Sequence, residues 1–204
     1  MSNINIIDVN LKYGTVYYRS LWNLTHIVIH HIMHRNATVN DIHNWHRGFG
    51  WSGIGYHYYI RKNGRTYKGR NIDVIGAHVA GKNTPSIGIA LEGDFRYEIE
   101  TEEQRESLKK LIKHINNILK RELIITTHRK FVNNSSCPEK FDLEKFLKYY
   151  NKNEVTDLEE ALKVITDVGI INSPAYWRNR AAEVKYFDIF IKNVANYVVN
   201  NLKI

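Results

Sequence analysis

The chain has 204 residues, 43% of them hydrophobic and 25% charged, and a formal net charge of +8. It is too apolar to be disordered, has no run near the roughly 18 apolar residues of a membrane span, and lacks a signal-peptide pattern, so we expect synthesis as a cytoplasmic protein. Its single cysteine, Cys137, excludes an internal disulfide, and the positive charge favours a polyanionic partner: nucleic acid, an anionic membrane or an anionic cell wall.

The first part of the chain alternates between strand-like and helix-like segments. Short runs rich in β-branched and aromatic residues predict five strands, at residues 25–31, 56–61, 66–70, 86–91 and 123–127. The dipeptide Asn63-Gly64 indicates a hairpin between the second and third of them. Capping boxes predict helices that begin at Thr38 and Thr101. We therefore expect an α/β fold with a central mixed β-sheet flanked by helices.

Residues 156–204 are predicted to form a small all-helical module. A capping box at Thr156 precedes an apolar helical face that stops at Gly169, and Ser173-Pro174 is typical of a second helix start. A third amphipathic helix is expected from Val184 onward. The polar residues 151–155 would link this module to a main domain at 1–150.

Charge and histidine are divided unevenly between these two parts. Residues 154–204 contain six basic and seven acidic side chains, and all ten histidines precede residue 129. The positive excess therefore belongs to the main domain.

Three residues at predicted strand ends and in a loop have the chemistry of a metal site. His30-His31 ends the first strand, His128 ends the last, and Cys137 follows in a loop rich in Ser and Asn. Two imidazoles and a thiolate suit Zn²⁺ and leave a fourth position for water, as in catalytic sites. Because strand side chains alternate between faces, one of His30 and His31 faces away. By spacing alone the grouping could also be chance, with Cys137 a small buried hydrophobe.

Four motifs in order carry a family resemblance: Ile27 to His31, Gly50 to Tyr58, Gly76 to Ile89, and His128 followed by Ser136-Cys137-Pro138. Together they resemble the zinc-dependent N-acetylmuramoyl-L-alanine amidases of the phage-lysozyme and peptidoglycan-recognition-protein type, over roughly residues 20 to 150. The resemblance implies a zinc amidase domain at 1–150, with zinc held by His30, His128 and Cys137. It further implies that zinc-activated water cleaves the amide bond between N-acetylmuramic acid and L-alanine of the stem peptide.

The resemblance also implies roles for residues around the metal. Tyr56 would hydrogen-bond the reacting water or the tetrahedral intermediate, although it could instead be a core aromatic of a strand. His78 and Asn83 would line the substrate cleft, or stabilise their own loop. His31 is included with them as a substrate contact, with packing or a supporting hydrogen bond as its alternative.

Two positions depart from the family pattern. Ala90 stands where some members carry Glu, and Ser135 where some carry Lys. The proton donor is then Tyr56, with Ser135 as a second candidate and Glu92 as a weaker one.

The expected partner is bacterial peptidoglycan, reached after release through a membrane lesion, as in phage endolysins. Five cations of the hairpin could also attract anionic wall polymers: Arg61, Lys62, Arg65, Lys68 and Arg70. The helical module resembles endolysin tails that bind the wall or self-associate, where Tyr176 and Trp177 could stack on sugar or lie in the core. The competing hypotheses are a non-catalytic peptidoglycan-binding protein on the same fold and, with charge as its sole support, a nucleic-acid-binding protein.

Overall fold

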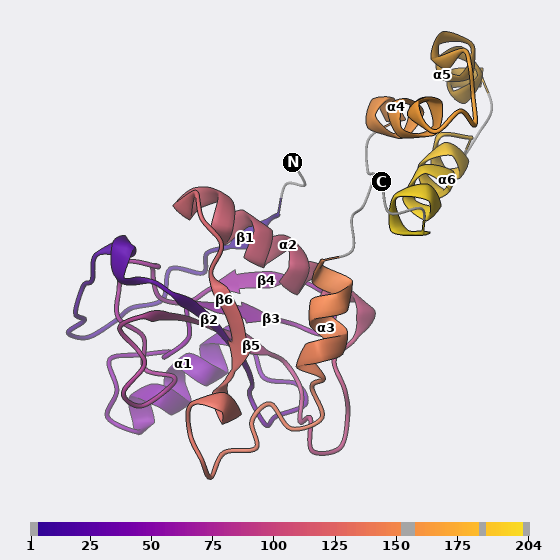
Figure 1. Ribbon diagram of the computed structural model, residues 1–204. Coiled ribbons are helices and arrows are strands. Elements are labelled where there is room, and N and C mark those ends of the chain that lie inside the picture. Colours follow the sequence, from indigo (N-terminus) through magenta and orange to yellow (C-terminus); the bar gives the residue numbers. More distant parts are fainter. Residues whose placement is uncertain (1–3, 152–157, 184–186, 202–204) are drawn as a thin grey trace. The chain divides into compact units, whose positions relative to one another are not determined.

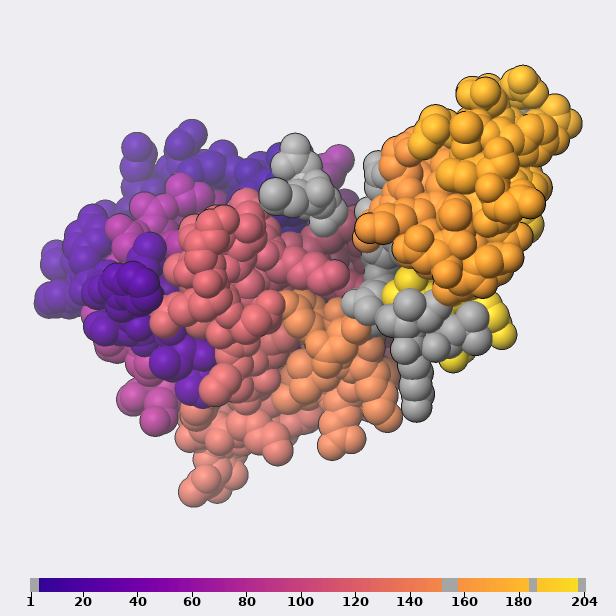
Figure 2. All heavy atoms as spheres, turned by 45° about the horizontal axis from the view of Figure 1, so that its top comes forward, coloured from indigo at the N-terminus to yellow at the C-terminus, as the bar shows by residue number. Residues whose placement is uncertain are grey.

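The computed structural model describes residues 4–151, 158–183 and 187–201. The chain divides into two compact units, Met1–Phe146 and Leu147–Ile204, whose outer surfaces are coloured by residue number in Figure 2. The division falls within helix α3 (Leu143–Tyr150), which the sequence patterns did not predict. The predicted linker at 151–155 lies, from residue 152 on, outside the described residues.

A six-stranded mixed sheet forms the centre of the first unit (Figure 1). Its order is β1-β4-β3-β5-β2-β6. The strands are β1 (Ile6–Ile7), β2 (His26–His31), β3 (Tyr58–Ile60), β4 (Thr66–Lys68), β5 (Ser86–Leu91) and β6 (Ile124–Thr127). β3 and β4 form the antiparallel hairpin, and the other neighbours are parallel. The predicted mixed sheet is confirmed, and β1 is an addition to it.

The central strands are apolar because they are covered on both faces. All six residues of β5 are buried, as are five of the six in β2, which is typical of parallel strands between helices. In register, His30 of β2 lies beside Ala90 of β5, and Ala90 lies beside Tyr59 of β3. Side chains that are in register share a face of the sheet. His30 therefore projects from the face on which Tyr59 and Ala90 pack.

Helices α1 (Val39–Gly48) and α2 (Glu102–Leu119) cover opposite faces of the sheet (Figure 1). Both predicted capping boxes are formed, with Asp41 and Gln104 reaching back to their N-caps, Thr38 and Thr101. α1 packs on the face that carries His30, because Ile42 shares a core cluster with Tyr59 and Ala90. Two short 3-10 helices, η1 (Leu21–Asn23) and η2 (His128–Lys130), precede β2 and follow β6.

Three helices form the second unit: α4 (Leu158–Asp167), α5 (Pro174–Glu183) and α6 (Phe187–Asn201). Their core is an apolar cluster of Ala161, Leu162, Ile165, Ile171, Ile191 and Ala195. Trp177 packs against this cluster and stacks on Phe187 at 5.7 Å between ring centroids, whereas Tyr176 is exposed. Of the predicted helix starts, Thr156 and Val184 lie outside the described residues. Among the described helices, none has the length and apolarity to cross a bilayer.

Candidate metal centre

The three predicted metal ligands meet at one edge of the sheet. His30 lies near the end of β2, and His128 directly follows β6. Because β2 and β6 are parallel neighbours, their carboxyl ends meet at the same edge. The loop after η2 adds Cys137, and one possible ligand atom from each of the three residues lies within 4.8 Å of the others. Cys137 Sγ lies 4.0 Å from His30 Nδ1, so the Nδ1 side of this ring faces the thiol.

Burial sets the protonation of these donors. Desolvation, helped by the neighbouring rings of His78 and His128, holds the pKa of His30 well below its ordinary value, and burial also lowers the pKa of His128. Both rings are therefore neutral at pH 7, as metal ligands must be. Burial raises the pKa of Cys137 to about 11, against a hydrogen bond from the His31 backbone that lowers it. A bound cation would favour the thiolate, and this N, N, S donor set fits zinc.

An arginine that the sequence patterns missed shapes the cysteine loop. The Arg129 backbone N–H donates to the Cys137 carbonyl at 2.9 Å, and its guanidinium donates to the carbonyls of Glu139 and Phe141. Ser135, the second candidate for proton transfer, accepts a hydrogen bond from the Cys137 backbone at 3.3 Å. Both contacts place the loop that carries the thiol.

Tyr56 lies beside the candidate ligands. Its ring centroid is 5.2 Å from that of His30, and burial raises the pKa of its hydroxyl above the ordinary value. The hydroxyl thus stays protonated and able to donate a hydrogen bond. The preceding Gly55 permits this arrangement, since a Cβ there would lie 2.0 Å from the Ala77 carbonyl oxygen.

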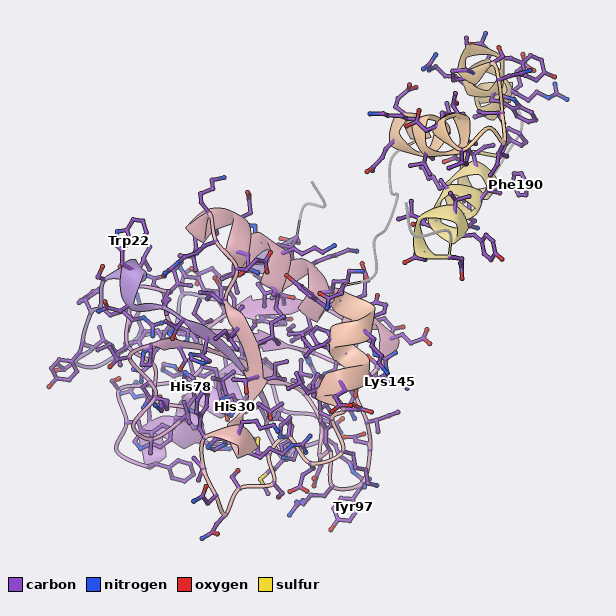
Figure 3. All side chains as sticks on the ribbon, in the orientation of Figure 1. Trp22, His30, His78, Tyr97, Lys145 and Phe190 are labelled. Carbon is purple, nitrogen blue, oxygen red and sulfur yellow. The ribbon has the colours of Figure 1, made fainter. Side chains whose placement is uncertain are left out.

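His78 and Asn83 make contacts other than the predicted substrate contacts. The Asn83 side-chain oxygen accepts hydrogen bonds from the His78 and Val79 backbones at 2.8 and 2.9 Å, so it shapes its own turn. The ring of His78 is 8% exposed, and its Nδ1 lies 3.0 Å from His30 Nε2 (Figure 3). His78 therefore contacts a candidate metal ligand directly.

His31 faces away from the centre, and its predicted substrate contact needs correction. His31 is 3% exposed, its ring stacks on that of Phe95, and its Nδ1 accepts a hydrogen bond from the Phe95 backbone at 3.0 Å. Strand alternation directs its side chain to the face opposite that of His30. Its ring takes part in packing, which was the alternative interpretation.

Glu92 and the hairpin cations are largely paired with one another or with nearby carboxylates. Glu92 is buried and accepts hydrogen bonds from Arg61 and from the Lys62 backbone, so it is not a free acid. The Lys62 and Lys68 ammonium groups pair with Glu98 and Asp8, and the buried Arg70 donates to the backbone carbonyls of Ile54 and Ile75. Three of the five cations, Arg61, Lys62 and Lys68, are therefore ion-paired, and Arg70 binds backbone carbonyls.

A second buried arginine fixes the loop that carries His78. Arg19 is 8% exposed, and its guanidinium donates hydrogen bonds to four backbone carbonyls, those of Ile72, Asn83, Thr84 and Ser86. No local pattern distinguishes this arginine from one on the surface, because the carbonyls that it binds lie more than fifty positions away.

Comparisons with known proteins agree with the geometry. The family described as N-acetylmuramoyl-L-alanine amidase matches residues 22–140. Endolysins of Enterobacteria phage K11 and Escherichia phage T7 are 33% identical over 115 residues and 31% identical over 126; the matches cover 54% and 59% of this chain and 74% and 80% of theirs. The solved N-acetylmuramoyl-L-alanine amidase LysC from Clostridium intestinale URNW has a TM-score of 0.68 and 34% identity, covering 73% of this chain and 99% of that one. Bumblebee PGRP-SA, at 21% identity and a TM-score of 0.65, covers 73% of this chain and 96% of its own, and shows similarity of fold alone.

Proposed function

This chain belongs to the N-acetylmuramoyl-L-alanine amidase family, and we propose that it is a zinc enzyme of the phage endolysin type. It is a peptidoglycan hydrolase that cleaves the amide bond between N-acetylmuramic acid and L-alanine of the stem peptide. The observation that supports the zinc mechanism is the convergence of His30, His128 and Cys137, which offer ligand atoms within 4.8 Å of one another. All three residues lie inside the matched residues 22–140.

His30, His128 and Cys137 would hold the zinc ion. When bound, Zn²⁺ polarises the scissile carbonyl as a Lewis acid and lowers the pKa of water from 15.7 to about 7. Three protein donors leave room for a further ligand, as catalytic zinc sites require. The neutral state of both imidazoles, caused by their burial, means that neither must lose a proton before binding the metal.

Tyr56 is the proposed hydrogen-bond donor to the oxygen that gains negative charge as the amide carbonyl is attacked. Its hydroxyl is protonated and its ring lies against that of His30, so a donor is available beside the proposed metal position. Hydrolysis adds one water across the C–N bond, and the departing L-alanine nitrogen gains a proton. Ser135 is the second candidate for that proton transfer, since its oxygen accepts from the Cys137 backbone and its hydroxyl hydrogen can point elsewhere.

Peptidoglycan is the proposed partner, and the enzyme would act on the cell wall. A non-catalytic peptidoglycan-binding protein is disfavoured because all three metal donors are present and close together. We also propose that the α4–α6 unit binds the wall or mediates homo-oligomer formation. Because three of the five hairpin cations, Arg61, Lys62 and Lys68, are ion-paired, we propose that attraction to anionic wall polymers would come mainly from the domain's overall charge.

The test combines metal content with product analysis. His128→Ala should lose stoichiometric zinc and abolish lysis of purified peptidoglycan, while His114→Ala, a histidine of α2 outside the ligand group, should retain both. Wild-type digestion should release new L-alanine amino termini without new reducing sugars. Reducing sugars as the product would refute the amidase assignment, and full activity of chelator-treated, zinc-free protein would refute the metal mechanism.

A further inference from the structure

His78 is buried against a candidate metal ligand at one end and hydrogen-bonded at the other. We propose that His78 is a positioning residue, a role that rests on the proposed zinc centre. It accepts the Nε2 proton of His30 and so holds His30 in the tautomer whose Nδ1 lone pair faces Cys137 and the metal position. The observation that motivates this role is the 3.0 Å distance between His30 Nε2 and His78 Nδ1.

The direction of this hydrogen bond follows from the far end of the His78 ring. The Ser86 hydroxyl donates its hydrogen to the Lys82 carbonyl, so toward His78 Nε2, 3.5 Å away, the Ser86 oxygen can only accept. The Ser86 backbone accepts a further hydrogen bond from the ring. The proton of a neutral His78 therefore lies on Nε2, and its Nδ1 is an acceptor.

The tautomer of His78 determines the tautomer of His30. An acceptor at His78 Nδ1 requires a donor at His30 Nε2, so the neutral His30 ring has its lone pair on Nδ1. That is the nitrogen 4.0 Å from Cys137 Sγ. Metal-binding histidines commonly donate their other ring N–H to a fixed acceptor, which sets both tautomer and ring orientation. Here the acceptor is a second imidazole.

The surroundings allow the His78 ring little freedom. A Cβ at Gly76 would lie 2.5 Å from His78 Cδ2, and one at Gly88 would lie 2.5 Å from His78 Cγ. Two glycines thus make the slot in which the ring lies. The Asn83 side-chain oxygen accepts a hydrogen bond from the His78 backbone N–H at 2.8 Å. A ring enclosed in this way is suited to fixing a neighbour and is poorly exposed to substrate.

The test removes and restores the acceptor. His78→Ala should weaken zinc binding 10- to 100-fold, the range for loss of such supporting contacts, measured by competition with a chromophoric chelator. His78→Asn, whose side-chain oxygen can occupy the Nδ1 position, should recover part of that loss, and His114→Ala should not change zinc affinity. The absorption spectrum of the Co²⁺-loaded protein should shift in His78→Ala and return toward wild type in His78→Asn.

A second measurement uses the wild-type protein and does not depend on the variants folding. In metal-free protein, long-range ¹H–¹⁵N correlation should show His30 protonated at Nε2 and bare at Nδ1. The opposite tautomer would overturn the proposal, as would wild-type zinc affinity in a folded His78→Ala with only a raised KM. If wild-type protein itself fails to bind zinc, the zinc centre fails; a normal zinc centre with an unaffected His78→Ala refutes only the role of His78.

Discussion

Individual side chains at the metal centre owe their chemistry to what surrounds them more than to their type. Burial raises the pKa of the Tyr56 hydroxyl above its ordinary value, and the Tyr56 ring lies beside that of His30. The preceding Gly55 lets the chain approach Ala77 closely. Burial also raises the pKa of Cys137, whose loop is shaped by the backbone and guanidinium of Arg129.

Substituting Tyr56→Phe removes the proposed hydrogen-bond donor and little else. We expect kcat on muropeptides to fall about 10²- to 10³-fold, the usual cost of losing one donor to a developing oxyanion. Zinc content should remain at the wild-type level, because Tyr56 is not among the metal donors. Tyr97→Phe, at an exposed tyrosine, is the matched control and should have wild-type kcat. A Tyr56→Phe enzyme with unchanged kcat would exclude the tyrosine from the reaction.

Different helices and strands contribute to the candidate site and to the helical unit. The parallel pair β2 and β6 delivers two histidines to one sheet edge, and α1 covers the face from which His30 projects. The helices α4, α5 and α6 have a core of their own, closed in part by Trp177 on Phe187. Trp177 is thus used internally, and wall contact through it is disfavoured compared with the exposed Tyr176.

Ending the chain after Tyr150 would delete α4–α6 and keep α3 whole. Because the first unit has its own sheet and core, this shortened protein should cleave soluble muropeptides like the full chain. We expect weaker sedimentation with purified cell walls, or a smaller oligomer by light scattering. If both properties stay as in the full chain, the proposed role of the helical unit is wrong.

Across the whole molecule, all ten histidines lie in the first unit, so the two units should differ in how their stability depends on pH. His57 and His46 lie inside the first unit, where their Nδ1 atoms accept backbone hydrogen bonds from Gly88 and Gly55. Burial lowers the pKa of His57 well below its ordinary value and that of His46 to about 4. Unfolded histidines titrate near 6.5. Unfolding below that pH therefore takes up protons, and stability falls as the pH drops from 6.5 toward 4.

Residues 147–204 contain no histidine, so we expect this loss in the first unit alone. In metal-free protein, thermal unfolding followed through assigned amide NMR signals should show the first unit's midpoint falling between pH 7 and pH 5. The second unit's midpoint should change little, because carboxylates titrate mainly below this window. Equal shifts in both units, or a constant midpoint for the first, would contradict the histidine explanation.

Local patterns were enough to predict most of the helices and strands. Capping boxes, the Asn63-Gly64 hairpin and β-branched runs act over a few neighbouring residues, so they can be read along the chain. The candidate ligands His30, His128 and Cys137 are predicted from their positions near strand ends and in a loop together with the family resemblance, and in the fold they lie close together. β1 and α3 were missed, since a two-residue strand carries almost no periodic signal.

The contacts of His31, His78 and Asn83 and the ion pairs of Arg61, Lys62 and Lys68 exist only in the folded chain. His78 and His30 lie 48 positions apart, and Arg61 and Glu92 lie 31 apart. Such contacts form only when parallel strands bring distant loops together, and no local propensity encodes which nitrogen of a ring then meets which neighbour. Charge and residue type are properties of the chain, whereas burial, tautomer and ion pairing exist only after folding, because they depend on what packs around each side chain.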